Sequence, residues 1–150
     1  MKYLIRPLEE KDIEAIVAGE TEVFGDSLGY DLIYADLKLN PYAHYLVLEI
    51  DGEVGGYLGL WITGEAAEMI NFYVAKKYQG MGFGKKLLDF ALRLCRLCKV
   101  KSLSLEVRSS NLPALRLYEK YGFVFSHVRK SYYRDGSDAH VLIKKFEVKE

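Results

Sequence analysis

The sequence is poor in cysteine, has no net charge and contains no long hydrophobic run. Its two cysteines, Cys95 and Cys98, are too few and too close together for the disulfide framework of a secreted protein, so we expect a reducing, cytoplasmic location. No apolar segment approaches the length of a membrane span. Charged residues at Arg6, Glu9 and Glu10 precede any apolar region of an export signal, so no such signal is predicted.

The composition predicts one globular domain over residues 1–150. Half of the residues are hydrophobic and 28% are charged, which is ordinary for such a domain, and the sequence contains no repeat, low-complexity tract or linker. Folding at this length buries roughly 70% of the surface of the unfolded chain. Neither a metal ion nor a disulfide is therefore needed for stability.

Positive and negative charges balance, but they are unevenly distributed. The 21 basic and 21 acidic residues argue against a general nucleic-acid or anionic-membrane binder. Between Lys11 and Lys38 every charged residue is acidic, whereas between Lys76 and Lys101 the basic residues are opposed only by Asp89. We expect two unlike surfaces on one domain, with two ordinary solvated helix faces as the alternative.

Hydrophobic periodicity predicts alternating strands and helices. Strands are expected at residues 3–7, 44–50, 53–62, 69–74, 103–107, 123–133 and 140–146. Helices are expected at residues 8–20, 30–39, 82–98 and 111–122. The pair Asp51-Gly52 predicts a tight type I′ turn, while Gly55, Gly56 and Gly59 suggest a bulge or a close approach to the backbone. The alternation favours an α/β or α+β fold with a mixed sheet.

A glycine-rich segment, residues 78–84, separates a predicted strand from a basic helix. Backbone N–H groups and the helix dipole can hold phosphate at such a position. A dinucleotide-binding fingerprint fails because Lys85 replaces its third glycine, and a P-loop fails at Gln79 and Lys86. Four lysines surround the segment, which favours a polyphosphate ligand over a plain helix start: Lys76, Lys77, Lys85 and Lys86.

The stretch Gln79-Gly-Met-Gly-Phe-Gly84 resembles the Gln/Arg-x-x-Gly-x-Gly/Ala signature of the Gcn5-related N-acetyltransferase (GNAT) superfamily. A second, more specific resemblance, to the ribosomal-protein-alanine N-acetyltransferase branch, covers residues 105–111, Ala114 and residues 117–123. The resemblance spans the whole chain. It implies a mixed, mostly antiparallel central sheet flanked by about four helices, and acetyl-coenzyme A (acetyl-CoA) as co-substrate.

The resemblance also implies which residues bind this co-substrate. The pyrophosphate is expected on the loop between the fourth strand and the third helix, which consists of Gln79, Gly80, Met81, Gly82, Phe83, Gly84 and Lys85. The preceding strand is expected to splay from its neighbour and leave N–H groups around Phe72 and Val74 free for the pantetheine arm and the thioester carbonyl. Tyr73, between them, is also expected at the cofactor site. Asn111 is expected to cap a helix and also to contact the cofactor, as is Tyr118.

Two residues are candidates for catalysis of acetyl transfer. Glu106 alternates with Leu105 and Val107, so it points to the opposite face of its strand, and the resemblance assigns it the role of base. The alternative is an ion pair with Arg108. The resemblance assigns Tyr118 the role of acid, since a phenol with a pKa near ~10 keeps its proton at neutral pH. The alternative is an ordinary core aromatic residue.

By resemblance, residues 20–36 and 132–138 frame the acceptor groove. The acidic residues there favour a basic peptide N-terminus, with Asp26 and Asp31 as specificity residues and Tyr132 and Tyr133 as walls. One feature departs from the branch, because residues 24–27 read Phe-Gly-Asp-Ser where the branch has Phe-Pro-Trp-Ser. The ribosomal acceptor therefore does not follow from the resemblance alone.

The leading hypothesis is an acetyl-CoA-dependent acetyltransferase that modifies the N-terminal α-amine of a protein, with a ribosomal protein as one candidate, by direct attack in a ternary complex. Alternatives are acetylation of a polyamine-like small amine and a non-catalytic acyl-CoA-binding domain. Cys95 and Cys98 are expected to pack in the core, near the end of a helix, rather than to act as a redox pair. The three histidines lack metal-ligand spacing, and the sequence indicates no oligomeric state.

Overall fold

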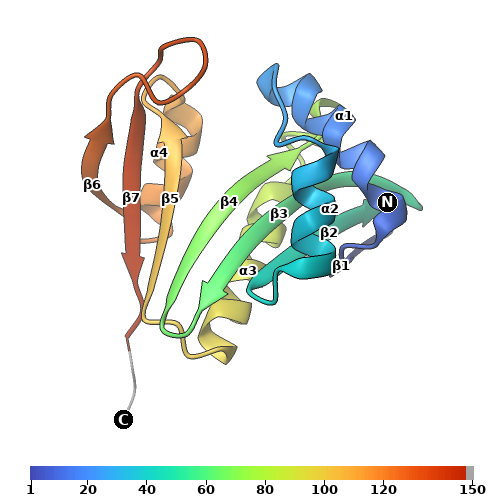
Figure 1. Cartoon of the computed structure of the whole chain (residues 1–150), viewed down its shortest axis with the longest axis horizontal. Helices are drawn as coiled ribbons and strands as arrows, with labels where there is room; N and C mark the ends of the chain where they lie inside the picture. Colours follow the sequence, from blue (N-terminus) through green and yellow to red (C-terminus); the bar gives the residue numbers. More distant parts are fainter. Residues whose placement is uncertain (148–150) are drawn as a thin grey trace.

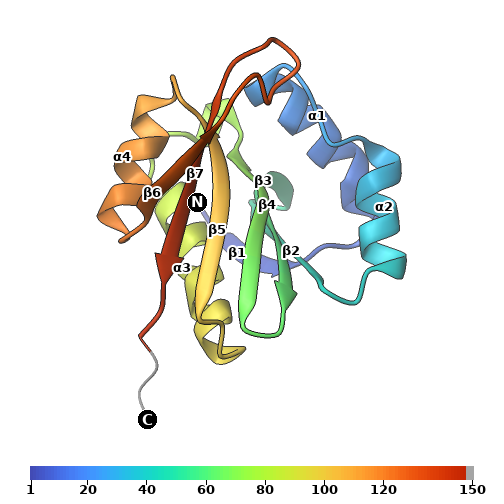
Figure 2. The same ribbon diagram turned by 60° about the vertical axis from the view of Figure 1, so that its left-hand side comes forward.

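A computed structural model describes residues 1–147 and contains one seven-stranded sheet between two helical layers (Figures 1 and 2). The strands are β1 (Tyr3–Pro7), β2 (Ala43–Ile50), β3 (Glu53–Thr63), β4 (Ala66–Val74), β5 (Ser102–Arg108), β6 (Val124–Arg129) and β7 (Ala139–Lys145). Their order across the sheet is β1-β2-β3-β4-β5-β7-β6, and only the β4–β5 pair is parallel. The predicted mixed, mostly antiparallel sheet is confirmed.

Helices cover both faces of this sheet. The α-helices are α1 (Ile13–Phe24), α2 (Tyr30–Leu39), α3 (Phe83–Leu97) and α4 (Leu112–Lys120), and two short 3-10 helices lie at Glu10–Asp12 and Lys76–Tyr78. The helices α1 and α2 lie on one face, and α3 and α4 lie on the other (Figure 2). Among the described residues, no helix is long and apolar enough to cross a membrane.

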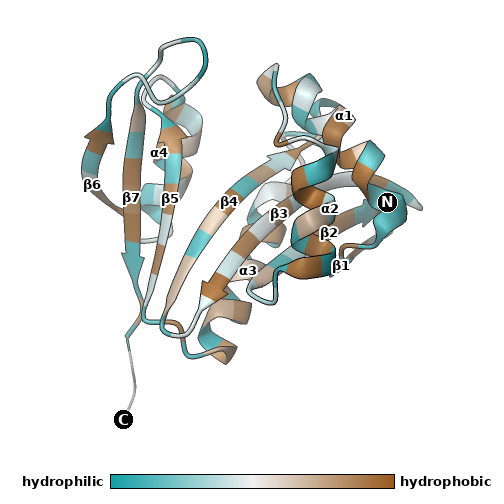
Figure 3. Ribbon diagram, viewed as in Figure 1, coloured by the Kyte–Doolittle hydropathy of each residue, from teal (hydrophilic) through white to brown (hydrophobic). Residues whose placement is uncertain are grey.

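Each face has its own hydrophobic cluster, because side chains alternate along each strand. The larger cluster joins α3 and α4 to the sheet through residues such as Leu58, Leu87 and Leu105, while the smaller one places Tyr57 against Ile13 of α1. Along β5, hydrophobic and hydrophilic residues alternate, as Figure 3 shows. Glu106 thus faces the side of the sheet that carries α1 and α2.

Most predicted elements are confirmed, and three of them have a boundary that differs by three residues or more. The first helix was expected at residues 8–20 but spans Ile13–Phe24, because a 3-10 turn precedes it and Gly25, at φ +77°, ends it. The strand β4 begins at Ala66 rather than at residue 69. The sixth strand was expected to reach residue 133 but ends at Arg129. In the loop that follows, Ser131 has φ +50° and its N–H donates to Asp138 Oδ1 over 2.9 Å.

The glycines of β3 lie where the backbone is crowded. A Cβ atom on Gly56 would lie 2.4 Å from the carbonyl oxygen of Tyr73 in β4, whereas one on Gly55 would first meet the end of the Ile50 side chain at 2.6 Å. The register of the β3–β4 pair shifts between Gly59 and Leu60, so a bulge is also present. The two features expected from these glycines, a close approach to the backbone and a bulge, are both confirmed.

We predict that Gly56→Ala lowers the free energy of unfolding by about 1–3 kcal/mol, because a backbone carbonyl cannot move aside as a side chain can. Gly55→Ala is the matched control, since the added methyl meets the rotatable Ile50 side chain and the loss should be smaller. Chemical denaturation of both variants measures the difference. Equal losses would contradict the assigned role of the Tyr73 carbonyl.

Candidate active site

The strands β4 and β5 are paired over only part of their length. The last paired residues are Met69 and Leu105, and beyond them β4 turns away from β5 (Figure 1). The change coincides with the bulge, where Gly59 pairs with Asn71 and Leu60 pairs with Met69. The predicted splay of this strand from its neighbour is thus present.

The backbone of β4 presents two N–H groups toward the side where β5 has departed. The N–H of Ala75 donates to Gly55 of β3 over 2.8 Å, so the alternating N–H groups of Phe72 and Val74 point away from β3. The N–H of Phe72 is not free, however, because it donates to Oδ1 of Asn71 over 3.0 Å. This differs from the expectation that both groups are unpaired. The side chain of Asn71 satisfies the donor that the departure of β5 leaves without a strand partner.

The glycine-rich loop connects β4 to the N-terminus of α3. Gly80 and Gly82 have φ angles of +80° and +85°, and Cβ atoms built on either residue would meet no neighbour within 4 Å. Gly82 is the N-cap of α3, so the first N–H groups of this helix have no acceptor within it. Gln79 stabilises the loop by donating from Nε2 to the carbonyl oxygen of Val74 over 2.9 Å. The result is an open turn lined by backbone donors.

The basic residues around this loop differ in how they are engaged. Lys77 forms an ion pair of 3.0 Å with Glu53, and the Lys86 ammonium lies 5.1 Å from the centre of the Tyr3 ring. Lys76 and Lys85 are exposed to solvent. Positive charge and backbone donors thus occur together at the N-terminus of α3, which is suited to a phosphate-containing ligand.

Tyr118 is buried on the side of the sheet that carries α3 and α4. Its side chain packs against Phe123, and its hydroxyl lies 3.9 Å from Sδ of Met69, the last β4 residue paired with β5. Burial raises the pKa of the Tyr118 hydroxyl, so the phenol stays protonated at neutral pH. The N-cap role predicted for Asn111 is confirmed, since its side chain accepts a hydrogen bond from the N–H of Ala114 over 3.3 Å.

Glu106 lies on the opposite face, as its alternation with buried neighbours predicts. Its Oε1 atom forms an ion pair of 3.2 Å with Nε of Arg129 on β6, rather than with Arg108. Arg108 instead pairs with Asp135 over 2.8 Å, and its guanidinium lies 4.1 Å from the centre of the Tyr133 ring. The sequence analysis missed Arg129, whose position two strands away from Glu106 is set by the β5–β7–β6 order.

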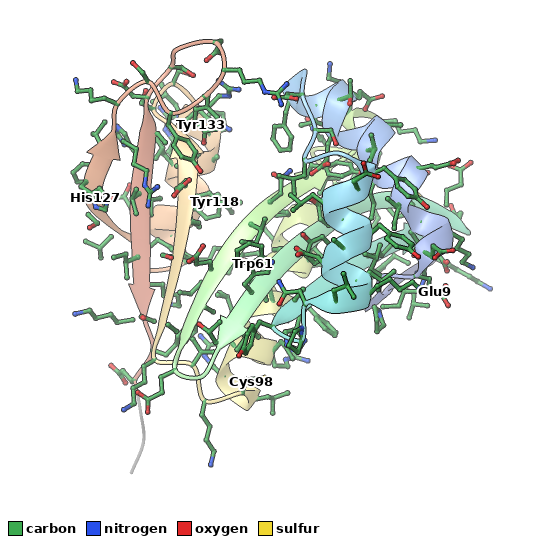
Figure 4. The ribbon with its side chains drawn as sticks, in the orientation of Figure 1. Glu9, Trp61, Cys98, Tyr118, His127 and Tyr133 are labelled. Carbon is green, nitrogen blue, oxygen red and sulfur yellow. The ribbon has the colours of Figure 1, made fainter. Side chains whose placement is uncertain are left out.

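Tyr132 and Tyr133 lie in the β6–β7 loop, next to Glu106. Their rings meet edge to face with centroids 5.1 Å apart, and Figure 4 shows Tyr133 near the upper end of β5. The Glu106 carboxylate beside Tyr132 raises the pKa of that hydroxyl to about 12. The two tyrosines thus form an aromatic cover next to the candidate base.

The two segments predicted to frame an acceptor groove meet through one ion pair. Asp26, between α1 and α2, lies 3.4 Å from Nε of Arg134 in the β6–β7 loop. Asp31 is exposed in the first turn of α2. Figure 2 shows the β6–β7 loop extending toward α1 at this end of the sheet.

The cysteines and a cavity beside β1 lie outside this arrangement. Cys95 is buried, as predicted, and burial raises the pKa of its thiol to about 11, but Cys98 is exposed at the end of α3 rather than packed in the core. The helix ends before Cys98 reaches the sheet. A cavity of about 350 Å³ beside the end of β1 is lined by residues such as Leu37 and Phe90 and by none of the predicted site residues.

A buried network escaped the sequence analysis. Glu20 is completely buried in α1 and accepts hydrogen bonds from Ser27, Leu28, Tyr57 and Asn71. The signal was present in the spacing, because Glu20 follows Ile16 by four residues on the apolar face of the helix. Charge alone groups Glu20 with the other acidic residues between Lys11 and Lys38.

Comparison with known proteins identifies the family. The family model described as "Acetyltransferase (GNAT) family" matches residues 10–123. The chain is 39% identical to a putative [ribosomal protein bS18]-alanine N-acetyltransferase of Bacillus subtilis, over 94% of both chains.

Two solved structures share the fold. The ribosomal-protein-S18-alanine N-acetyltransferase of Escherichia coli has a TM-score of 0.91 and 25% identity, covering 99% of this chain and 97% of that one. Ard1 from Thermoplasma volcanium has a TM-score of 0.90 and 29% identity, covering 99% of this chain and all of that one. The chain belongs to the GNAT acetyltransferase family.

Proposed function

We propose that this chain, as one N-acetyltransferase domain of residues 1–150, transfers the acetyl group of acetyl-CoA to the N-terminal α-amine of a protein. One observation carries the proposal. Glu106 and Tyr118 lie on opposite faces of the sheet, on either side of the point where β4 parts from β5. A thioester placed between these strands would have a base on one side and a proton donor on the other.

The donor side is supported by the geometry of the loop and of β4. The residues assigned to the pyrophosphate are Gln79, Gly80, Met81, Gly82, Phe83, Gly84 and Lys85. The positive φ angles and the absence of Cβ atoms at Gly80 and Gly82 leave room for a ligand against the backbone. Phe72 and Val74 are assigned to the pantetheine arm through their backbone N–H groups, and Tyr73 is assigned to the cofactor as the residue between them. Asn111, the N-cap of α4, and Tyr118, within α4, are assigned to the cofactor as well. A ligand that uses the Phe72 N–H must displace the Asn71 oxygen from it.

The chemistry assigned to this chain is a pair of proton transfers around one acyl transfer. Glu106 accepts a proton from the α-ammonium, and the free amine attacks the thioester carbonyl carbon. As the C–S bond breaks, the electron pair goes to sulfur, and Tyr118 supplies the proton that yields the thiol. The nitrogen, which carries one excess proton after the attack, loses that proton to solvent as the amide forms, and Tyr118 is reprotonated from solvent. The α-amine has an ordinary pKa of ~7.7–8.0, so less work is required of the base than for a lysine, whose pKa is ~10.4.

The acceptor is proposed to be a basic protein N-terminus. Asp26 and Asp31 would attract its positive charge, and Tyr132 and Tyr133 would form the wall of its path toward Glu106. The Bacillus subtilis and Escherichia coli relatives carry the names of ribosomal-protein-alanine N-acetyltransferases. The N-terminus of that ribosomal protein is therefore the first acceptor to test, despite the Gly25-Asp26 departure.

The test is release of thiol from acetyl-CoA with three kinds of acceptor: peptides with free N-termini, Nα-blocked peptides that contain lysine, and polyamines. We expect turnover with free N-termini alone. Turnover with polyamines alone would replace the proposal with small-amine acetylation. Binding of acetyl-CoA without turnover on any acceptor would favour a non-catalytic acyl-CoA-binding domain.

We predict that Glu106→Gln and Tyr118→Phe each lower kcat by about 10²-fold or more, because each removes one proton transfer while keeping the shape of the side chain. Neither change should alter the Kd of acetyl-CoA by more than about twofold. Steady-state kinetics and calorimetry measure the two quantities. Unchanged kcat in both variants would overturn the assignment of base and acid.

We predict that Gly82→Ala weakens acetyl-CoA binding by about tenfold or more, because the methyl group occupies open space beside the loop and strains a φ angle of +85°. Gly64→Ala is the matched control. Gly64 has φ +66° and open surroundings in the β3–β4 turn. Its substitution by alanine should therefore cost similar stability, but at a site away from the glycine-rich loop. If both variants bind acetyl-CoA equally well, the loop does not hold the cofactor.

A further inference from the structure

The buried carboxylate of Glu20 has four hydrogen-bond donors around it. Oε1 accepts from the Ser27 hydroxyl over 2.8 Å and from the Leu28 N–H over 3.3 Å. Oε2 accepts from the Tyr57 hydroxyl over 2.5 Å and from the Nδ2 group of Asn71. These four donors, all within residues 1–147, are neutral groups. The carboxylate is thus stabilised by neutral donors alone.

These donors come from the two sides of the proposed reaction. Ser27 and Leu28 belong to the acceptor loop, residues 25–29, which also contains Asp26 and joins α1 to α2. Asn71 lies at the bulge of β4 and occupies the N–H of Phe72 with its own Oδ1 atom. One carboxylate therefore links the acceptor loop to the strand that faces the β4–β5 gap.

The arrangement is specific to a carboxylate. Burying such a group costs free energy unless hydrogen bonds replace the lost water, so an apolar side chain would pack the helix at lower cost. An amide of the same shape presents N–H groups to one pair of donors and cannot accept from them. The hydrogen bond to Glu20 also determines which end of the Asn71 amide faces Phe72.

A second side chain of α1 contacts the segment that follows β4. Glu22 accepts a hydrogen bond over 3.1 Å from the N–H of Lys76, the first residue of the turn that precedes the glycine-rich loop. Gly19, next to Glu20, leaves the space in which the ring of Tyr73 packs against the helix. The end of α1 is thus fitted closely to the part of β4 that precedes the cofactor loop.

We propose that Glu20 is a positioning residue for the acceptor: it holds the acceptor loop in place against the β4 bulge. The inference rests on the proposed function, because it assigns the loop to acceptor binding. Glu20 does not reach the reacting atoms. Its effect on the acceptor passes through Ser27 and Leu28 to the neighbouring Asp26.

The experiment compares Glu20→Gln with Asp36→Asn. Asp36 is also a buried carboxylate, and it accepts from the Tyr45 hydroxyl over 2.6 Å, from Trp61 Nε1 over 2.8 Å and from Asn40 Nδ2 over 3.2 Å. Asp36 lies near the end of α2 that is remote from the acceptor loop and from Asp31, and its buried side chain is turned to the sheet, where Figure 4 shows Trp61. None of its three partners lies in the acceptor loop. Both substitutions should lower stability, but only Glu20→Gln should disturb the loop.

We expect Glu20→Gln to raise the KM of a free-N-terminus peptide about tenfold while the Kd of acetyl-CoA changes by less than about twofold. Asp36→Asn should change neither by more than about twofold. Ser27→Ala, which removes one hydroxyl, should raise the same KM by about threefold and add little to Glu20→Gln in the double variant. Equal KM values in wild type, Ser27→Ala and Glu20→Gln would overturn the proposal, as would equal increases for Glu20→Gln and Asp36→Asn.

Hydrogen exchange provides a readout that requires no acceptor. The Leu28 N–H should lose protection in Glu20→Gln and keep it in Asp36→Asn. If the wild type acetylates no peptide, the proposed function fails, whereas unchanged Leu28 exchange in Glu20→Gln shows that Glu20 does not hold the loop.

Discussion

The structure depends on the place where the single parallel pair of strands comes apart. The β4–β5 pairing ends at Met69 and Leu105, next to the bulge that sets the register of β4 against β3. A strand that keeps pairing on one side and loses it on the other exposes N–H groups only along the open side. Where β4 and β5 remain paired, the sheet is continuous, so its two halves stay joined. The site is therefore a local interruption of an otherwise regular ladder of hydrogen bonds.

The helices on the two faces are attached by different means. The helices α3 and α4 pack through a broad apolar cluster, whereas α1 and α2 combine a smaller apolar cluster with three buried acidic residues. Asp12 pairs with Arg6 over 2.8 Å, and Glu20 and Asp36 accept hydrogen bonds from neutral donors. Apolar contacts have little directional preference, whereas hydrogen bonds to a carboxylate require defined distances and angles. The helices α1 and α2, which the proposed function assigns to the acceptor, are thus positioned by buried polar contacts.

Sequence reasoning predicted features whose cause is local. Asn111 caps its helix and Asp51-Gly52 takes the positive φ angles of its turn, because both preferences are properties of one or two residues. The face of Glu106 followed from the period of two along a strand. The arrival of Arg129 beside Glu106 depends on the order of three strands, and that order is not encoded in the spacing of the two residues.

The same distinction explains the wrong expectations. The strand expected at residues 123–133 includes Tyr132 and Tyr133, whose aromatic side chains favour strands. Hydrogen bonds within the loop, including Tyr133 N–H to the Ser137 carbonyl over 3.2 Å, outweigh that preference. Phe72 was expected to have a free N–H, and the neighbouring Asn71 occupies it instead. Cys98 fits the helical period, yet the helix stops one residue before it. In each case a tertiary contact or an element end decided the outcome.

Two carboxylates, Glu106 and Glu20, differ in how firmly the structure holds them. Glu106 retains 26% exposure of its side chain and Arg129 retains 52%, so their ion pair is screened by solvent and contributes no more than about 1 kcal/mol. The buried carboxylate of Glu20, in contrast, is completely enclosed by its four donors. A weakly held carboxylate can exchange one cation for another at small cost, while an enclosed one cannot. In the proposed mechanism, an exchangeable carboxylate thus stands where the acceptor ammonium would arrive, and a fixed one holds the acceptor loop.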